Sequence, residues 1–531
     1  MGNKQMKHMM NGAVILSVAS LIAKILSAVY RVPFQNMVGN TGFYVYQQVY
    51  PLYGIGMTFA LSGFPIFLSK LVAERKSQSS QKELLKRTFV ILSIFSIVLF
   101  AGIYGFAGKI ASLMGDSGLT PLVQAVSWMF LCMPFLVVWR GYFQGNYRML
   151  PTAVSQVVEQ VVRVAVILIA AFLYLKLGWT DYQMGIIAMS SAWIAGIAAL
   201  LVLAYYYYVK KEANFIAPAF EKQGSEELYQ PTSYSTLLYR FLTEGTAICI
   251  LSAMLILLQL IDSFTLYKGM TLSGISPDVA KNLKGIYDRG QPLVQLGMVV
   301  GTGFAASLVP MLSNYYVSKR EFEFQRTAVS LLRITTAFAM AATSGMLVLL
   351  PYINHVLFGD RAGNGVLSIY LLSIILASLI GAYNAILQSR NQHRLAMIAL
   401  LVGLVVKVLF NDLLVRAFGT LGASLATVMS LAVILSCLWI GSPVALKGSI
   451  LRGGFLVKLV LCCWVMTFVV LLTVLFLSLF PLFSGRSGAI LVTFIGIIVG
   501  VSIFGFSILK WKLFTIREWL YMPFGKKLLR K

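Results

Sequence analysis

Five ionisable residues stand at or inside stretches of sequence that are otherwise apolar. Lys24 and Arg31 lie seven residues apart in the first apolar stretch, a spacing that places them on one face of a helix. Asp262 closes a later stretch, and the adjacent Asp288 and Arg289 open the next one. Ionisable groups at membrane depth are energetically costly, so such residues are candidates for function.

The chemistry that these residues offer is the binding of an anion. Cationic side chains around a water-filled cavity suit an anionic substrate, and the planar guanidinium matches phosphate oxygens. We therefore interpret Lys24, Arg31, Arg289, Asp288 and Asp262 as candidate substrate-binding residues. Two simpler interpretations stay open. In the first, the Arg31 side chain merely reaches the outer lipid headgroups. In the second, Asp288 and Arg289 merely form an ion pair in an outer loop.

Four further charged residues indicate a structural or coupling role. Glu159 and Arg163 are four residues apart on one helix and can pair with each other. Lys407 holds the place of Arg163 in an internal repeat described below, without an acid four residues earlier. Lys70, near the inner end of its apolar stretch, is typical of an anchor that reaches the headgroups.

The sequence contains no pattern typical of an enzyme. Three histidines and five scattered cysteines suggest neither a metal site nor a disulfide framework, and there is no Walker motif. We therefore expect a transporter without a cofactor or a metal, which does not hydrolyse ATP itself. A gradient, the membrane potential or a downstream reaction would supply the work.

Composition shows which elements must hold these residues. Of the 531 residues, 59% are hydrophobic and 11% are charged, which is typical of a polytopic membrane protein. Lipid leaves unpaired backbone groups without a partner, so each spanning stretch must be a helix. The sequence predicts an all-α protein with 14 transmembrane helices, near residues 12–33, 43–70, 88–113, 121–139, 152–175, 184–208, 241–265, 287–313, 329–351, 365–387, 395–415, 420–441, 455–480 and 487–509.

The positions of the basic residues predict the orientation. With a cytoplasmic N-terminus, about 30 of the 43 lysines and arginines fall in inner loops or at inner helix ends. An even number of spans places the C-terminus inside as well. The net charge of +25 is thus explained by topology and anionic inner-leaflet lipid, and it requires no nucleic acid as a partner.

Two halves of the sequence repeat each other at an offset of about 241–245 residues. Three echoes, each weak alone, occur in the same order, and the third pairs Val161-Val-Arg163 with Val405-Val-Lys407. This repeat predicts two six-helix lobes in parallel orientation. Such lobes place a substrate pathway between them and open it alternately to the two sides of the membrane. The predicted domains are an N-terminal lobe at 1–211, a cytoplasmic linker at 212–239, a C-terminal lobe at 240–442, and two extra helices with a basic tail at 443–531.

This organisation resembles the MOP (multidrug/oligosaccharidyl-lipid/polysaccharide) exporter superfamily over essentially the whole chain. Within it, two segments of the first half are similar to the SpoVB/YtgP-type polysaccharide-biosynthesis branch, KILSAVYRVPFQNMVGNTGFYVYQQVYPLY and RGYFQGNYRMLPTAVSQVVEQVVR. So are GIYDRGQPLVQLG and GTLGASLATV of the second half. This branch contains MurJ-like lipid II flippases of bacterial cell-wall synthesis. The resemblance implies a monomer in the bacterial plasma membrane, near the cell-wall synthesis machinery.

The resemblance also implies a mechanism and assigns residues to it. MurJ-like flippases pass the headgroup of an undecaprenyl-pyrophosphate-linked precursor through a central cationic cavity, while the lipid tail stays in the bilayer. Asp288 and Arg289 match the family's segment at the start of span 8, and Lys24 matches its first basic residue. The family's next arginine falls at Tyr30, one residue from Arg31. Its span 2 arginine has no clear counterpart near residues 54–57.

The function expected first is therefore a lipid II flippase. A flippase for another lipid-linked oligosaccharide, such as a teichuronic, capsular or O-antigen repeat, differs only in the headgroup. A cation-coupled multidrug exporter of the same superfamily would favour buried carboxylates, whereas the balance here is basic. A membrane scaffold in a division or sporulation complex would need neither Lys24 nor Arg289.

Overall fold

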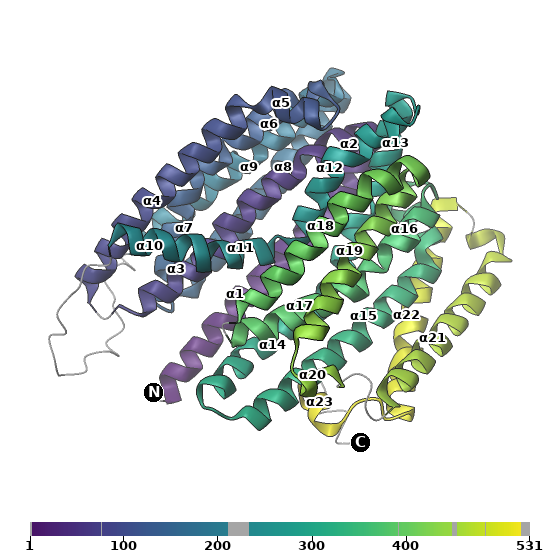
Figure 1. Ribbon diagram of the computed structural model, residues 1–531. Coiled ribbons are helices and arrows are strands. Elements are labelled where there is room, and N and C mark those ends of the chain that lie inside the picture. The colour runs from purple at the N-terminus through teal and green to yellow at the C-terminus, as the bar shows by residue number, and fades with distance from the viewer. Residues whose placement is uncertain are drawn as a thin grey trace. The chain divides into compact units, whose positions relative to one another are not determined.

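The computed structural model describes residues 3–75, 77–210, 233–390, 392–448, 454–483 and 485–521, and in these ranges it contains helices and turns but no strand (Figure 1). The predicted all-α fold of a polytopic membrane protein is confirmed. In the described ranges, 12 helical segments are long and apolar enough to span a membrane. One of them, Val18–Ala73, covers two of the predicted spans, and Gly290–Val317 is not among the 12. The count of 14 stays a prediction.

The chain packs as two compact units, Met1–Gly285 and Ile286–Lys531. This division reflects only how densely each unit packs internally. It does not test the predicted domains, so the lobes at 1–211 and 240–442 and the appendage at 443–531 stay predictions. Most of the predicted linker at 212–239 lies outside the described residues, as do the last ten residues of the basic tail.

Several helices of the first unit continue one another along a single bent segment, and α8 and α9 pack along their lengths. The helix bounds are α1 Asn3–Val29, α2 Arg31–Met57, α3 Phe64–Ala73, α4 Gln78–Gly105, α5 Ala107–Leu113, α6 Thr120–Ser127, α7 Met129–Gly145, α8 Met149–Leu177, α9 Asp181–Ala204, α10 Tyr234–Arg240, α11 Thr246–Ser252, α12 Met254–Leu272 and α13 Pro277–Asp288, with π turns η1 Thr58–Gly63, η3 Tyr205–Val209 and η6 Phe241–Gly245 and a 3₁₀ turn η2 Ser117–Leu119.

The path from α1 to α3 is bent at defined residues. A turn at Tyr30 separates α1 from α2, and the following Pro33 lacks an amide hydrogen to continue the helical bonding. Gly39 then takes a left-handed backbone with φ of 69°, which a side chain would disfavour. The π turn η1 separates α2 from α3. Three interruptions therefore shape the segment that carries Lys24 and Arg31.

Glycines let α7 approach α3 closely. A Cβ atom at Gly141 would meet the Leu68 side chain at 2.7 Å, and one at Gly145 would meet the Ser69 carbonyl oxygen at 2.8 Å. The spacing of four residues puts both glycines on one face of α7, which is the small-residue packing pattern of membrane helices. This contact fixes α7 and its Arg140 against the bent segment.

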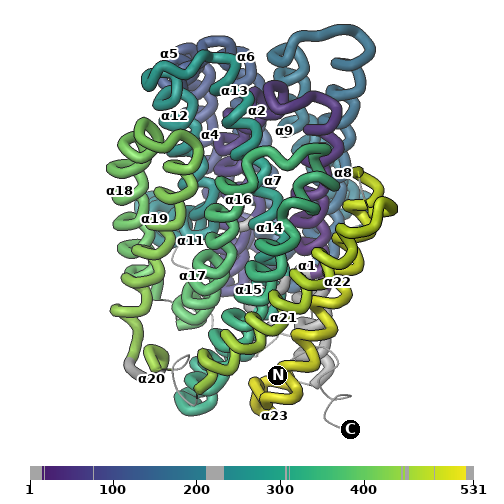
Figure 2. Tube along the Cα trace, turned by 90° about the vertical axis from the view of Figure 1, so that its right-hand side faces the viewer, coloured from purple at the N-terminus to yellow at the C-terminus, as the bar shows by residue number. Residues whose placement is uncertain are grey.

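The second unit begins at the last turn of α13. Its helices are α14 Gly290–Val317, α15 Glu321–Phe358, α16 Asn364–Leu371, α17 Ser373–Ser389, α18 His393–Phe418, α19 Thr420–Gly441, α20 Val444–Lys447, α21 Phe455–Ser478, α22 Gly485–Lys510 and α23 Ile516–Tyr521, with a 3₁₀ turn η8 at Pro481–Phe483. Helices α18 and α19 pack along their lengths, and α21 and α22 both pack on the long α15 (Figure 2).

The last spanning helix, α22, carries a face of small residues. Gly496 and Gly500, four residues apart on α22, are both buried. A Cβ atom at Gly496 would meet Leu349 of α15 at 2.6 Å, and one at Gly500 would meet Val470 of α21 at 3.3 Å. This GxxxG pair thus packs α22 against α15 and α21.

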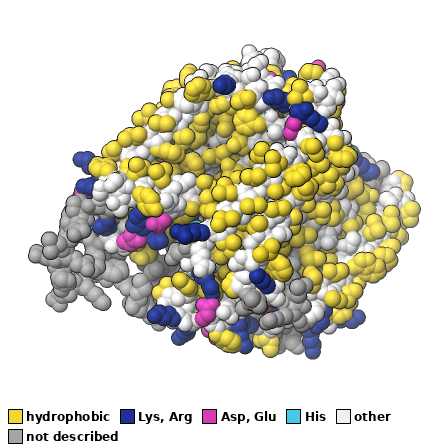
Figure 3. Space-filling view, in the orientation of Figure 1, with side chains coloured by type: hydrophobic (Ala, Val, Ile, Leu, Met, Phe, Trp, Pro, Cys, Tyr) yellow, Lys and Arg dark blue, Asp and Glu magenta, His cyan; other side chains and the backbone are white. Residues whose placement is uncertain are grey.

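The outer surface of the helices is apolar. Large side chains such as Ile94, Val98, Leu201 and Trp464 are exposed by more than half. On the face drawn in Figure 3, hydrophobic side chains cover the long helices and the lysines and arginines lie toward helix ends. A surface of this kind suits contact with lipid.

Candidate functional site

Lys24 lines a cavity of about 170 Å³ in the first unit. Its walls come from α1, α2, η1, α3, α7 and α8, and they combine apolar side chains with Ser20, Ser27, Gln144 and Gln156. The Ser20 hydroxyl donates to the Gln156 side chain at 3.2 Å, which joins α1 to α8. Lys24 is exposed and forms no ion pair with any residue that the structure describes. A cation without a counter-charge at such a cavity is suited to an anion.

Arg163 stands directly behind one wall of this cavity. Its guanidinium donates to the Ser27 hydroxyl at 3.1 Å and to the side-chain oxygen of Gln160 at 2.8 Å. It also lies over the rings of Tyr30 and Tyr53, at 5.1 and 4.7 Å from their centroids. The charge is thus held by neutral oxygens and aromatic faces, which do not cancel it. A net positive charge remains beside the cavity wall.

Arg31 is completely buried, under the same group of aromatic rings. Its guanidinium lies 4.5 Å from the ring centroid of Tyr50, and the Tyr30 and Tyr46 hydroxyls are 2.9 Å apart. Lys24 is exposed whereas Arg31 is not, so the two side chains do not present one common surface. The turn at Tyr30, which the sequence analysis did not anticipate, separates them.

The predicted pairing of Glu159 with Arg163 is wrong. Glu159 instead accepts a hydrogen bond from Arg140 of α7 at 2.6 Å, and both side chains are buried. Arg140 also donates to the Ser155 hydroxyl at 3.2 Å and to the Ala60 carbonyl oxygen in η1 at 3.1 Å. The reason is that α7 runs on to Gly145, beyond the span predicted at 121–139, so Arg140 lies inside a helix that packs against α8.

In the second unit Arg289 is buried and forms a bidentate ion pair. Its two terminal nitrogens lie 2.6 and 2.8 Å from the two carboxylate oxygens of Asp360, and one also donates to Asn354 at 3.3 Å. Its guanidinium lies over the Phe358 ring at 4.9 Å. These hydrogen bonds hold the pKa of the Asp360 carboxyl below its ordinary value. Sequence analysis named Arg289 and missed Asp360, whose only signal is its place in a short polar turn.

The two other predicted acids are buried as well. Asp262 lies in α12 and is 2% exposed, and Asp288 is the last residue of α13 and is fully buried. Arg289 follows as the cap residue of α14 and so opens that helix, as predicted, whereas Asp288 ends the helix before it. Substrate binding by Asp262, Asp288, Arg31 and Arg289 stays a prediction.

Lys407 and Lys70 occupy contrasting places. Lys407 of α18 is fully buried, and its ammonium donates to the Thr427 hydroxyl at 2.6 Å and to the Ala423 carbonyl oxygen at 3.1 Å. It therefore ties α18 to α19, which agrees with a structural role. Lys70 is exposed and lies 3.8 Å from Glu244. Of the residues predicted to bind substrate, the structure places Lys24 at a described cavity.

The tyrosines beside the two arginines were not singled out from sequence. Tyr46, Tyr50 and Tyr53 recur on α2 at helical spacing, and Tyr30 joins them from the preceding turn. Spacing alone does not distinguish such a stripe from an ordinary core face. The buried guanidiniums of Arg31 and Arg163 lie over the rings of these tyrosines, so the tyrosines help to stabilise the two buried charges.

The sequence matches a known family over more than half of its length. The family described as "Polysaccharide biosynthesis protein" matches residues 9–316. A Bacillus subtilis (strain 168) protein described as "Uncharacterized membrane protein YabM" is 37% identical over 525 residues, which cover 97% of this chain and 95% of that protein. The chain belongs to the polysaccharide biosynthesis protein family. The resemblance to the MOP exporter superfamily and its MurJ-like branch is thereby confirmed.

Two kinds of transporter share the fold of this family member. The lipid II flippase MurJ of Bacillus subtilis (strain 168) is 29% identical over 442 residues, covering 79% of this chain and 80% of that protein. A structure of lipid II flippase MurJ in an inward closed conformation superposes with a TM-score of 0.62 at 15% identity, covering 94% of this chain and 99% of that chain. An inward-facing multidrug resistance MATE family transporter of the MOP superfamily gives 0.61 at 14% identity, covering 83% and 98%.

Proposed function

We propose that this chain is a flippase for an undecaprenyl-pyrophosphate-linked cell-wall precursor, lipid II, which it moves from the inner to the outer leaflet of the bacterial plasma membrane. The observation that carries the proposal is Lys24, an exposed cation at a cavity among spanning helices, with no carboxylate paired to it in the described part of the chain. The similarity to a lipid II flippase over most of the chain supports the same substrate.

The cavity offers what a phosphate-bearing headgroup requires to leave water. A charged group in a dry membrane interior is costly unless polar partners replace its hydration. Lys24 supplies a counter-charge, and Ser20, Gln144 and Gln156 supply hydrogen-bonding groups around it. The Arg163 charge behind Ser27 raises the local positive potential. The apolar lipid tail would remain in the bilayer and need no such path.

The proposed cycle is alternating access. The headgroup would enter from the cytoplasmic side, where we expect both termini from the positive-inside rule, and leave on the outer side. Binding can drive this change only as far as the substrate prefers one state over the other. The net direction then comes from a gradient, the membrane potential or consumption of the flipped product.

A flippase for a different lipid-linked oligosaccharide is the second candidate, because the same pyrophosphate chemistry would serve another sugar. A multidrug exporter is disfavoured although a MATE transporter shares the fold. A cationic drug requires carboxylates at its site, whereas the residues that line the Lys24 cavity include a lysine and no acid.

Complementation of a strain depleted of its lipid II flippase tests the proposal. Wild-type protein should restore growth, and Lys24→Gln, which removes the charge and keeps much of the side-chain length, should fail at equal membrane abundance. Lys24→Arg should retain part of the activity. Lys176→Gln is the matched control, since Lys176 is an exposed lysine in the last turn of α8, away from the cavity.

Two results would contradict the proposal. Failure of properly inserted wild-type protein to restore growth would exclude lipid II as the substrate. Rescue of a strain that lacks a flippase for a different undecaprenyl-linked oligosaccharide would then favour the second candidate. Full rescue by Lys24→Gln would show that the cavity cation is not needed for transport.

A further inference from the structure

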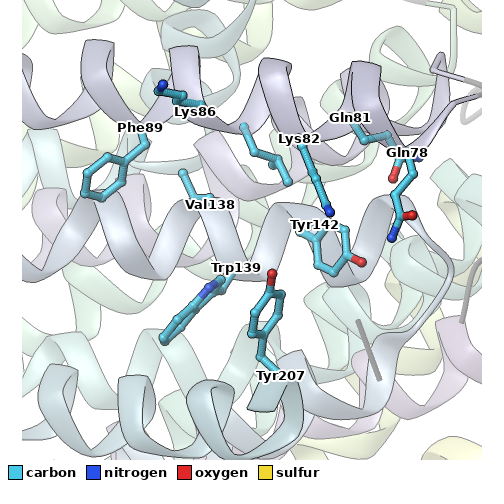
Figure 4. Close-up of a pocket in the computed structure, with 10 residues that line it drawn as sticks. Gln78, Gln81, Lys82, Lys86, Phe89, Val138, Trp139, Tyr142 and Tyr207 are labelled. Carbon is cyan, nitrogen blue, oxygen red and sulfur yellow. The ribbon is translucent and has the colours of Figure 1, made fainter. Parts of the chain in front are cut away.

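A second cavity lies on another side of the first unit, between α4, α7 and the π turn η3. Its volume is about 300 Å³, larger than the Lys24 cavity. One wall is a single face of α4, on which Gln78, Lys82, Leu85, Lys86 and Phe89 recur at helical spacing. The other walls, from α7 and η3, are formed by Val138, Trp139, Tyr142 and Tyr207 (Figure 4).

The cations of this cavity carry no counter-charge in the described ranges. Lys82 and Lys86 are exposed, and neither forms an ion pair with a described residue. The neighbouring Glu83 is already paired with Arg87, so it does not neutralise them. In Figure 4, Lys82 extends toward Tyr142, and the Lys86 ammonium points away from it at the rim. Two exposed lysines thus stand on the α4 wall of one cavity.

The aromatic wall has the composition of a membrane interface. The rings of Trp139 and Tyr207 stack with centroids 6.2 Å apart, and Tyr142 meets Tyr207 edge-on at 6.2 Å. The Tyr207 hydroxyl points toward α7, between Trp139 and Tyr142 (Figure 4). Amphipathic rings of this kind prefer the headgroup level of a bilayer. Val138, Leu85 and Phe89 give the cavity an apolar floor.

The rim of the cavity is held in place by the chain itself. The Gln81 side chain donates to the carbonyl oxygens of Val72 and Arg75, both at 3.3 Å, which closes the connection from α3 to α4. Ser77 caps α4 by accepting from the Ser80 amide at 3.2 Å. The amino-terminal end of a helix also favours negative charge. The site is therefore built before any ligand arrives.

We propose that this cavity binds the phosphate headgroup of an anionic glycerophospholipid of the inner leaflet. Basic pockets between spanning helices on the cytoplasmic side suit such headgroups. Lys82 and Lys86 hold the phosphate, Tyr207 donates a hydrogen bond to it, and the apolar floor receives the start of the acyl chains. The positive-inside distribution places this end of α4 at the inner leaflet. The site is separate from the Lys24 cavity, since the two have no lining residue in common.

Lipid retention by the purified full-length protein, followed by native mass spectrometry, tests this site. Phosphatidylglycerol should bind more tightly than phosphatidylcholine of the same chain length. The double variant Lys82→Gln/Lys86→Gln should weaken phosphatidylglycerol binding by about fivefold for each lysine, and leave phosphatidylcholine unchanged. Tyr207→Phe, which removes only the hydroxyl, should weaken it roughly two- to tenfold.

The matched control is Lys109→Gln/Lys176→Gln, which removes the same charge from outside the cavity. It should bind phosphatidylglycerol as the wild type does. Equal binding by the double variant and the wild type, or an equal loss in the control, would overturn the proposal. Displacement by millimolar glycerol 3-phosphate would assign the cavity to a soluble anion. Tighter retention of undecaprenyl phosphate than of phosphatidylglycerol would assign it to the substrate lipid. Either result overturns the phospholipid assignment.

Discussion

Arg140 and Glu159 show how a buried charge pair can serve architecture and leave transport to another residue. Arg140 bonds a carboxylate, a hydroxyl and the Ala60 carbonyl oxygen, which the π turn η1 leaves accessible. Its partners come from α8 and η1, so a single guanidinium joins three segments. Lys24, in contrast, lines a cavity and forms no ion pair in the described part of the chain. Burial and pairing thus distinguish Arg140, which holds helices together, from Lys24, which we propose binds the substrate.

Removal of the Glu159 charge should strongly destabilise the first unit. In Glu159→Gln the Arg140 guanidinium stays buried without a counter-charge, which costs about 3–5 kcal/mol. Glu83→Gln is the control, because its ion pair with Arg87 is partly exposed and contributes about 0–1 kcal/mol. Equilibrium unfolding in mixed detergent micelles measures both. A Glu159→Gln variant no less stable than Glu83→Gln would show that the pair is not structural.

The ion pair of Asp360 with Arg289 should make the stability of the folded protein depend on pH in the acid range. Because Arg289 lowers its folded-state pKa, the carboxylate adds stability above its ordinary pKa of about 3.9, and this is lost as pH falls through the lowered value. The side chain is 44% exposed, so solvent screening limits the effect to the order of 1 kcal/mol. Asp360→Asn should be less stable at neutral pH and lose less on acidification. An identical acid response in both proteins would contradict this.

At the scale of elements, close packing of helices depends on small residues at exact places. The pair Gly141 and Gly145 brings α7 against α3, and Gly496 and Gly500 hold α22 against α15 and α21. The two glycines of each pair are four residues apart, so they lie on the same face of their helix and leave it without side chains there. In membranes, where apolar burial gives little net drive between helices, such contact supplies much of the association.

Gly145→Ala should destabilise the first unit by about 1–3 kcal/mol, because its methyl group would overlap the Ser69 carbonyl oxygen and the Val72 side chain. Gly102→Ala on α4 is the control. Its methyl group would meet nothing within 4 Å, and alanine favours a helix by up to about 1 kcal/mol. The same detergent unfolding experiment compares them. Equal stability of the two variants would mean that α7 can shift without cost.

The sequence predicted the spanning helices well where they are uninterrupted. The range 420–441 coincides with α19, and 455–480 and 487–509 lie within two residues of α21 and α22 at either end. Hydropathy could not predict the π turn η1, because it depends on how α2 packs. Lys24, Arg289 and Lys407 were found because a charge in an apolar stretch is visible in sequence. Their partners Asp360, Thr427 and the tyrosines were not, since tertiary contacts select them.

At the scale of the whole molecule, the distribution of charge gives a testable orientation. Lysines and arginines concentrate at the helix ends predicted to face the cytoplasm. The turn at Gly178, between α8 and α9, lies on the predicted outer side. The apolar helix surfaces then lie in the bilayer between the two sides.

Reporter fusions measure this orientation. A fluorescent protein fused after Lys531 should fluoresce, and alkaline phosphatase at the same place should be inactive, because the C-terminus is predicted inside. Alkaline phosphatase inserted after Gly178 should be active. The opposite pattern at either position would refute the predicted topology, and with it the inner-leaflet assignment of the α4–α7 cavity.

The central claim is that the Lys24 cavity carries the phosphate-bearing headgroup across the membrane. The most direct measurement is translocation of fluorescent lipid II in proteoliposomes that contain the purified protein, followed by a membrane-impermeant quencher. Wild-type protein and Lys176→Gln should expose lipid II to the quencher at equal rates. Lys24→Gln should slow exposure about tenfold, since loss of one charge-assisted contact costs about 1.5–3 kcal/mol. Equal rates for Lys24→Gln and wild-type protein, or no translocation by inserted wild-type protein, would contradict the account.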